Sequence, residues 1–260
     1  MELGLAGKSV IVTGGSKGLG RAIAEEILRE GGSVSICARH GDEVERAAEE
    51  LRAVSPSVHA QPADVTDPEQ VTSFIRASAE TFGGIDALVN NAGRAHPGTF
   101  ETLRDDDWKD DLDVKLFSQI RCSREVLPYL RRRGGGRVVN INAVYGKYPD
   151  PAFFATSVNR AACQSFSKVL ATELAPENIL VNSVNIGYVV TPQWKNIHQR
   201  RAPALSEEEF FSQMAAAEVP MGRFGRADEV SGIVAFLLSE RASYITGASV
   251  DVAGGMGKYV

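Results

Sequence analysis

A glycine-rich segment near the start of the chain has the residue types and spacing to hold a phosphate group. Thr13 to Gly20 reads TGGSKGLG, and it follows the short apolar run Ser9 to Val12 and leads directly into helix-forming residues. Glycines allow a tight turn and a close approach of the backbone to a diphosphate, while the N-terminus of the next helix offers unpaired N–H groups. We expect the ligand to contact Gly14, Ser16, Lys17, Gly18, Leu19 and Gly20.

Together with other segments, this glycine loop resembles the short-chain dehydrogenase/reductase family over nearly the whole chain. The matching segments are Thr13 to Gly20 as TGxxxGxG, Asp64 before Val65, Asn90-Asn91-Ala92-Gly93, Pro220 to Gly225, Thr246-Gly247 and Gly254-Gly255. The resemblance implies a Rossmann-type fold, a nicotinamide cofactor and usually a homotetramer. It also implies that Asp64 and Val65 lie at the adenine and Asn91 beside the cofactor ribose, with Ala92, Gly93 and Gly187 as further cofactor-binding residues.

Two cations favour NADP(H) over NAD(H). An acidic residue after the second strand binds the ribose 2′-OH of NAD, whereas an arginine there accommodates a 2′-phosphate. This chain has Ala38-Arg39 at that point, and Lys17 inside the glycine loop adds a second cation. A guanidinium and an ammonium group suit a phosphate dianion. The alternative for both is an ordinary solvated surface cation.

The resemblance fails at the four residues that the family usually employs in catalysis. Aligning the chain on Val138 to Ile141 puts Ala143 at the usual serine, Thr156 at the usual tyrosine and Arg160 at the usual lysine, and Lys115 stands at the usual asparagine. Alanine has no polar side-chain atom, and the threonine hydroxyl is a poor acid near neutral pH. Arg160 could hold the ribose or stabilise an oxyanion, but it cannot give up its proton.

Tyr145 is the residue that could replace the missing acid. It lies two residues beyond Ala143 and eleven before Thr156, a spacing that resembles the acting tyrosine of the 2,4-dienoyl-CoA reductases. Those relatives keep lysine where this chain has Arg160. We expect Lys115 or Arg160 to lower the pKa of the Tyr145 phenol, so that Tyr145, and not Thr156, supplies the proton. The alternative is that Tyr145 is an aromatic wall of the substrate pocket.

Three functions remain open on these residues. The first is an NADP(H)-dependent oxidoreductase that transfers hydride to or from an apolar carbonyl or conjugated enoyl substrate, with Tyr145, Lys115, Arg160 and Thr156 at the active site. The second is an isomerase, dehydratase or lyase that keeps NADP bound without redox change. The third is a catalytically inactive NADP-binding regulatory protein. Stoichiometric NADPH oxidation would distinguish the first from the other two.

The elements that must position these residues alternate regularly along the chain. Val/Ile/Leu-rich runs alternate with longer amphipathic stretches, which is typical of βαβ units around a parallel sheet. We predict an α/β, doubly wound fold with a seven-stranded parallel sheet flanked by helices. The expected strands are 8–13, 33–38, 57–61, 85–89, 136–141, 179–184 and 247–251. The expected helices are 18–31, 42–54, 67–81, 105–132, 155–175 and 227–239.

One segment interrupts this alternation. From 191 to about 219 the chain becomes polar and aromatic, with helical periodicity after Ser206. It follows the carboxyl end of the sixth strand, where ligands bind in open α/β sheets. We interpret 191–219 as a substrate lid on a single domain, 1–260, the alternative being a surface excursion.

Composition and charge narrow the function further. The 260 residues carry a net charge of −5, which disfavours nucleic-acid binding because phosphate neutralisation needs a basic face. No apolar run approaches the ~20 residues that span a membrane. The three cysteines are far apart and suggest neither a disulfide framework nor a zinc site, so we expect no metal and a reducing, cytoplasmic location. Phe117, Ile120, Phe166 and Val169 would lie at the homotetramer interface that the resemblance implies.

Overall fold

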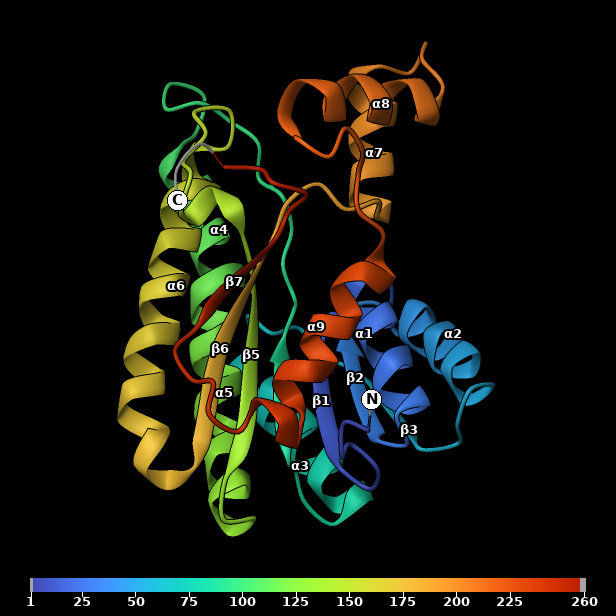
Figure 1. The fold of residues 1–260 in the computed structure, drawn as a ribbon, viewed down its shortest axis with the longest axis vertical. Coiled ribbons are helices and arrows are strands. Elements are labelled where there is room, and N and C mark those ends of the chain that lie inside the picture. Colours follow the sequence, from blue (N-terminus) through green and yellow to red (C-terminus); the bar gives the residue numbers. More distant parts are fainter. Residues whose placement is uncertain (1, 258–260) are drawn as a thin grey trace.

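The seven strands form one parallel sheet in the order β3-β2-β1-β4-β5-β6-β7 (Figure 1). The structure is a computed structural model that describes residues 2–257. The strands are β1 Ser9–Thr13, β2 Ser33–Ala38, β3 Val58–Pro62, β4 Ala87–Asn90, β5 Gly136–Ala143, β6 Ile179–Ile186 and β7 Ser249–Val252. This arrangement confirms the predicted doubly wound α/β fold.

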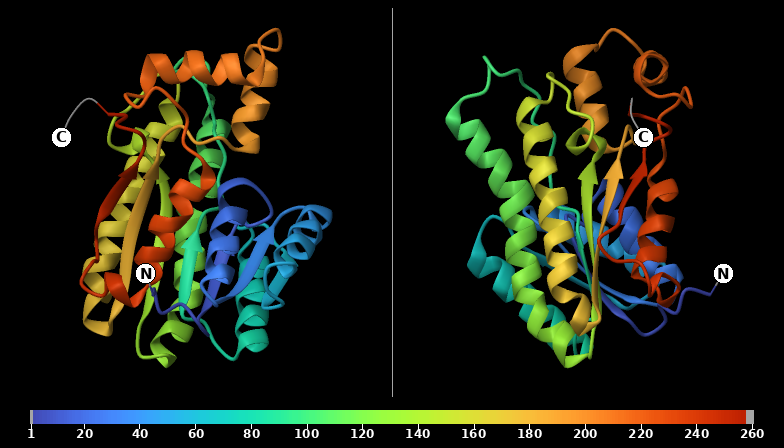
Figure 2. Two further views of the ribbon diagram at one scale, coloured as in Figure 1. Left: turned by 45° about the vertical axis from the view of Figure 1, so that its right-hand side comes forward. Right: turned by 60° about the vertical axis from the view of Figure 1, so that its left-hand side comes forward.

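Helices cover both faces of the sheet, so the central strands are buried and read as continuous apolar runs (Figure 2). The larger helices are α1 Gly18–Arg29, α2 Gly41–Arg52, α3 Pro68–Phe82, α4 Asp105–Leu112, α5 Ser118–Arg132, α6 Phe154–Leu174, α7 Pro192–Arg201, α8 Glu207–Glu218 and α9 Ala227–Leu238. Apolar side chains of α1, α2 and α9 form the core on one face, and those of α3, α5 and α6 form the core on the other.

The order in which successive strands join the sheet reverses between β1 and β4. This switch point sets the position of the glycine loop. β1 pairs with β2 on one side and with β4 on the other. Asn91, directly after β4, donates from Nδ2 to the carbonyl oxygens of Thr13, at 2.9 Å, and Gly14, at 3.0 Å. These bonds fix the glycine loop at the crevice where ligands bind in open α/β sheets.

The long helix predicted over 105–132 is not regular throughout. Between α4 and α5 the residues Asp113–Phe117 form one π-helical segment, η1, with Lys115 at its centre. A π-helical turn inserts one extra residue and changes the direction in which side chains point. Lys115 is thereby completely buried, facing α6. The hydrophobic period predicted a helix here, but it could not reveal this local change of winding.

Helices α7 and α8 stand beyond the carboxyl ends of the strands (Figures 1 and 2). Ser206 starts α8 with a capping box, in which its hydroxyl accepts from the Glu209 N–H and the Glu209 carboxylate accepts from the Ser206 N–H. Buried side chains of both helices, among them Trp194 and Phe210, form an apolar cluster with Tyr188 and Phe224. The segment 191–219 therefore packs into a small apolar core that it shares with residues outside it, and its role as a lid stays a prediction.

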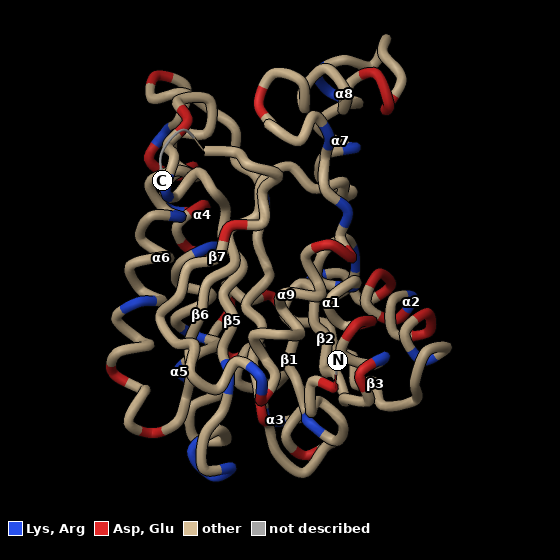
Figure 3. Tube along the Cα trace, in the orientation of Figure 1, with Lys and Arg blue, Asp and Glu red and all other residues tan. Residues whose placement is uncertain are grey.

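Charged residues of both signs are spread over the whole trace (Figure 3). The three arginines at the end of α5 each contact another residue of the protein. Arg131 pairs with Glu177, the Arg132 guanidinium lies over the Tyr129 ring, and Arg133 donates to the Gly83 carbonyl. Across residues 2–257, none of the helices combines the length and hydrophobicity required to span a bilayer.

Gly20 is the glycine where a side chain would meet the most rigid neighbours. A Cβ there would overlap the carbonyl oxygen of Gly14 and the amide nitrogen of Asn91. We expect Gly20→Ala to lower the free energy of unfolding by about 1–3 kcal/mol because backbone must shift. Gly232→Ala in α9, where no atom lies within 4 Å, is the control. It should be neutral or stabilising by up to ~1 kcal/mol in urea unfolding. Equal stability of both variants would contradict the tight packing of the loop.

Candidate active site at the carboxyl edge of the sheet

The glycine loop has the shape of a phosphate cradle. Gly14 and Gly18 adopt positive φ angles of 66° and 57°, and Lys17 precedes the first turn of α1. No side chain caps this helix N-terminus, so its first N–H groups are available to an anion. A Cβ at Gly20 would overlap the Gly14 carbonyl oxygen, so the tight turn requires glycine there. These residues fit a diphosphate-containing cofactor.

The two cations predicted at the 2′-phosphate differ in their surroundings. Lys17 is exposed and pairs with Glu43 of α2, with 3.0 Å between Nζ and Oε2. Arg39, directly after β2, is exposed and has no ion pair within the described part of the chain. Arg39 is thus free to meet a phosphate, whereas Lys17 would have to leave Glu43 or share it.

The residues predicted at the adenine and ribose border the same edge. Val65 is buried, and Asp64 accepts hydrogen bonds from the Thr66 N–H at 2.9 Å and the Thr66 hydroxyl at 2.8 Å. Asn91 is used by the protein itself, because its amide holds the glycine loop. Of the neighbouring residues, Ala92 donates its N–H to Thr13 Oγ1 at 3.1 Å, while Gly93 is exposed.

Lys115 is the centre of a buried polar network between α4, η1 and α6. Its ammonium group pairs with the Asp111 carboxylate one turn earlier and donates to Thr156 Oγ1 at 2.8 Å. The second oxygen of Asp111 accepts from Asn159 Nδ2 at 2.8 Å. Lys115 and Asp111 are both completely buried, and every partner in the network comes from a neighbouring helix. The structure therefore brings together Lys115 and Thr156, two of the four predicted catalytic residues.

The ionisation of Lys115 is shifted by this environment. Burial, and to a smaller extent repulsion from Arg160, lower the pKa of Lys115 to about 8, although the Asp111 carboxylate opposes both effects. An ammonium group with a pKa near 8 can release its proton near neutral pH, which an exposed lysine cannot do. Thr156 lies between this group and the sheet edge, since its hydroxyl also reaches the His96 carbonyl at 3.5 Å.

Arg160 lies one turn beyond Thr156 and holds the end of β5. It donates from Nη1 to the Ile141 carbonyl at 2.8 Å and to Asn142 Oδ1 at 3.2 Å, while its buried Nε has no partner among residues 2–257. Its Nη2 borders Gly93, where an added Cβ would lie 3.0 Å away. Arg160 therefore presents positive charge beside Gly93, and its contact with a ribose or an oxyanion stays a prediction.

Tyr145 has neither predicted cation as a neighbour. It lies in the short 3₁₀ turn η2, Val144–Gly146, stacks on Phe153 with 4.9 Å between ring centroids, and donates its hydroxyl to Tyr188 Oη at 3.1 Å. Burial raises the pKa of Tyr145, and the hydrogen bond with Tyr188 adds to the shift. The expectation that Lys115 or Arg160 lowers this pKa is therefore wrong. The reason is that Lys115 is bound by Asp111 and Thr156, and Arg160 donates to the end of β5, while the Tyr145 hydroxyl donates to Tyr188.

Sequence reasoning missed three members of the site. Asp111 precedes Lys115 by four residues, the spacing at which a helix places opposite charges together. That signal was present but does not distinguish a buried pair from an exposed one. Asn159 contacts Asp111 of the network, and Tyr188 contacts Tyr145. Both contacts arise only from the tertiary fold, so no local pattern could identify these residues.

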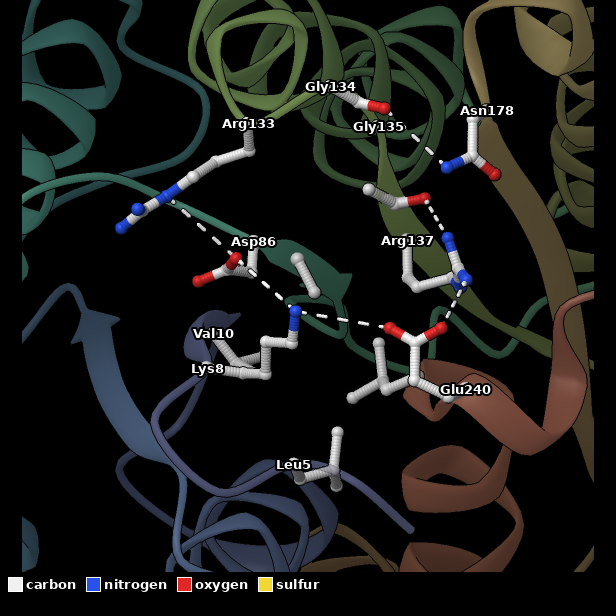
Figure 4. A pocket seen from close by; sticks show the side chains of 13 residues that line it. Leu5, Lys8, Val10, Asp86, Arg133, Gly134, Gly135, Arg137, Asn178 and Glu240 are labelled. Carbon is white, nitrogen blue, oxygen red and sulfur yellow. Dashed lines mark hydrogen bonds and ion pairs between the residues drawn. The ribbon is translucent and has the colours of Figure 1, made fainter.

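A charged cavity lies at the opposite edge of the sheet and takes no part in this site. It has a volume of about 160 Å³ and lies among the amino ends of β1, β4 and β5 (Figure 4). Lys8, Arg133 and Arg137 face Asp86 and Glu240 there, with ion-pair distances from 3.7 to 3.9 Å. None of the predicted site residues lines it.

Known proteins match the chain over nearly its full length. The profile of a family described as enoyl-(acyl carrier protein) reductase matches residues 14–257. The 3-oxoacyl-(acyl-carrier-protein) reductase FabG of Aquifex aeolicus is 35% identical over 257 residues, covering 98% of this chain and 100% of that protein. The chain belongs to the short-chain dehydrogenase/reductase family. The prediction of an oxidoreductase of this family is confirmed.

Two solved structures share both the fold and about a third of the sequence. L-sorbose reductase of Gluconobacter frateurii, complexed with NADPH and L-sorbose, is 33% identical with a TM-score of 0.96 over 100% of both chains. A short-chain oxidoreductase of Pseudomonas aeruginosa PAO1, bound to NADPH and described as containing an atypical catalytic center, is 34% identical with a TM-score of 0.91. That match covers 97% of this chain and 98% of the other.

The buried pair makes a specific prediction for stability. Lys115→Met leaves the Asp111 charge buried without its counter-ion, so we expect unfolding free energy to fall by about 3–5 kcal/mol. Removing both charges in Lys115→Met with Asp111→Leu should recover at least half of that loss, because no isolated charge remains. Urea unfolding of the two single variants and the double variant measures the coupling. Additive losses would show that the two charges do not stabilise one another.

Proposed function

We propose that this protein is an NADP(H)-dependent reductase of a carbonyl or conjugated enoyl substrate, in which Lys115 and Thr156 together deliver the proton. The single observation that carries the proposal is the hydrogen bond from Lys115 Nζ to Thr156 Oγ1 at the carboxyl edge of the sheet. It couples an ammonium group of lowered pKa to a hydroxyl that lies one helical turn before Arg160, the residue whose Nη2 borders Gly93.

The cofactor half of the proposal rests on the glycine loop and on Arg39. The N–H groups at the start of α1 would hold the diphosphate, the Asp64-Val65 segment the adenine, and Arg39 the 2′-phosphate. Arg160, beside Gly93, would hold the ribose on the nicotinamide side. When bound, the cofactor supplies a hydride to the substrate carbon. The NADPH found in both solved relatives supports this assignment.

The protein then has to neutralise the negative charge that develops on the substrate oxygen. Thr156 accepts a hydrogen bond from Lys115, and its own hydrogen is held only by the long 3.5 Å contact to the His96 carbonyl. The hydroxyl can therefore turn its hydrogen to a substrate oxygen. As Thr156 gives this proton to the oxygen, it takes one from Lys115, so the threonine conveys a proton that the lysine supplies.

Tyr145 fits better as part of the substrate surface than as the acid. Its phenol is already used in the bond to Tyr188, and its raised pKa makes it a weaker proton donor than Lys115. Together with the half-buried Tyr148, Phe211 and Met214 it belongs to the apolar cluster beneath α7 and α8. This environment favours a substrate with an apolar body, for which 191–219 serves as the lid.

The decisive experiment measures NADPH oxidation at 340 nm against a panel of 3-oxoacyl thioesters, ketoses and enoyl thioesters, with product analysis. Stoichiometric conversion of NADPH and substrate supports the reductase. Substrate conversion without NADPH oxidation, or tight NADPH binding with no turnover on the whole panel, contradicts it.

Cofactor choice can be tested directly by titration. We expect NADPH to bind more tightly than NADH, and Arg39→Asp to weaken NADPH binding by about 1.5–3 kcal/mol through the loss of a charge-assisted phosphate contact. NADH binding should be unchanged or improved. Lys17→Gln should cost less, because Lys17 is already paired with Glu43. Calorimetric affinities that do not respond to Arg39→Asp would refute the 2′-phosphate assignment.

The proton route predicts which hydroxyl matters. Thr156→Val keeps the shape but removes the hydroxyl between Lys115 and the substrate, so we expect kcat to fall by about 10²-fold or more. Tyr145→Phe keeps the ring and its stacking on Phe153, and we expect less than about tenfold loss. Both variants should bind NADPH normally. The opposite order of losses would assign the acid to Tyr145.

The same route sets the direction of the pH dependence. Reduction requires Lys115 to be protonated, and its pKa is about 8. The protonated fraction falls as pH rises through that value, so kcat/KM for reduction should be level below pH about 8 and decline above it. In Thr156→Val this alkaline limb should disappear from the residual rate, because the lysine no longer reaches the substrate.

We further propose a homotetramer in a cytoplasmic location. Phe117 at the end of η1 and Val169 on α6 expose 43% and 62% of their surface, and Ile120 on α5 and Phe166 on α6 lie partly exposed. The described cysteines are free, which is compatible with a reducing compartment. Light scattering at micromolar concentration should give four times the chain mass, and Phe117→Glu with Val169→Glu should lower it. A monomeric wild type would exclude the tetramer.

A further inference from the structure

A histidine that the proposed reaction does not use lies next to the buried pair. His96, in the loop between β4 and α4, has a side chain that is 20% exposed. Its Nδ1 lies 4.0 Å from Asp111 Oδ1, the same carboxylate oxygen that holds Lys115. Its Nε2 lies 3.4 Å from Asp107 Oδ1, and Nδ1 is also 4.0 Å from Asp110 Oδ2.

We propose that His96 and Asp111 form the path by which Lys115 regains a proton from solvent after each reduction. This inference rests on the proposed function, because Lys115 loses a proton only if it supplies one through Thr156. His96 and Asp111 do not touch the substrate in this scheme. They are positioning and relay residues that act through Lys115.

Each step of this path conserves protons. Hydride addition and one proton from Thr156 convert the carbonyl to an alcohol, and Thr156 is restored by a proton from Lys115, which leaves a neutral amine. A protonated His96 then gives one proton to Asp111, and Asp111 gives one to Lys115. His96 finally takes a proton from water. The net uptake is one proton from solvent per substrate reduced.

Burial makes such a path necessary. Lys115 and Asp111 have no exposed surface, and bound substrate or product would cover the Thr156 side. Of the titratable side chains in contact with Asp111 within residues 2–257, His96 reaches the surface, whereas Lys115 does not. The 4.0 Å separation exceeds a direct hydrogen bond, so the proposed transfer requires a rotation of the imidazole or one bridging water.

Electrostatics favours transfer in this direction. Asp107 and Asp110 on α4 place negative charge beside the imidazole. Once Lys115 is neutral, the buried Asp111 carboxylate has lost its counter-ion, and a proton that passes from His96 through Asp111 to Lys115 restores the ion pair. Arg94, which pairs with Asp110, is the neighbouring cation on the same loop.

His96→Gln tests the path without disturbing the core, because it removes the titrating ring and keeps a polar side chain. We expect kcat for NADPH oxidation in weak buffer at neutral pH to fall by about tenfold, with KM unchanged and with recovery on addition of imidazole. Rescue by a diffusible proton carrier is not expected of a structural residue. Lys109→Gln on α4 is the matched control, because the exposed Lys109 ammonium group pairs with Asp106 and not with His96 or Asp111 in the described part of the chain.

A second measurement does not depend on turnover. In cofactor-free protein labelled with ¹⁵N-lysine, exchange of the Lys115 ammonium protons with water should be slower in His96→Gln than in wild type or Lys109→Gln. The Lys115 resonance is the one that Thr156→Val shifts. Unchanged exchange, or a reduced kcat that imidazole does not restore, would overturn the inference. If the wild type oxidises no NADPH with any substrate, the proposed function fails while the exchange measurement still decides whether His96 serves Lys115.

Discussion

The pair formed by Lys115 and Asp111 is the interaction on which the arrangement of the site depends. Two charges without any exposed surface cost free energy unless each is matched and hydrogen-bonded. Asp111, Asn159 and Thr156 supply these matches, and the π-helical turn at Lys115 brings the ammonium group to them. Breaking any one of these contacts leaves a buried polar group without a hydrogen-bond partner. The network therefore fixes α4 against α6 at the position where the proposed proton transfer occurs.

Two groups that could act as acids, Lys115 and Tyr145, lie in different local environments. Lys115 is buried among polar partners near Arg160, and its pKa falls toward neutrality. Tyr145 is buried among aromatic rings with another phenol as its partner, and its pKa rises. Burial disfavours the charged form in both cases, which makes an ammonium group a stronger acid and a phenol a weaker one. The pKa shifts of the two groups therefore have opposite signs, and this difference, not the degree of burial, favours the lysine as the acid.

The cofactor side follows from the order of the strands. Because β1 lies between β2 and β4, the glycine loop, Arg39 and the Asn91 segment all end at one edge. Asn91 ties the loop to β4, and Arg39 is left free after β2. Relatives that share about a third of the sequence over this whole sheet have been solved with NADPH, which agrees with the chemistry of these residues. The charged cavity at the amino edge is remote from this chemistry.

The sequence by itself determined the sheet, most helices, the glycine loop and the family, because these depend on local periodicity and on glycine positions that few other residues can fill. It also predicted, from the resemblance, that Thr156, Lys115 and Arg160 depart from the family pattern. It could not decide which of them meet, since the Lys115–Thr156 contact joins residues 41 positions apart through a π turn that hydrophobic periodicity does not encode. The partner of Tyr145 is 43 positions away, so its raised pKa was equally hidden. Only the packing of α4 and η1 against α6 and of the lid on η2 fixed these environments, and with them the proton affinities of the candidate residues.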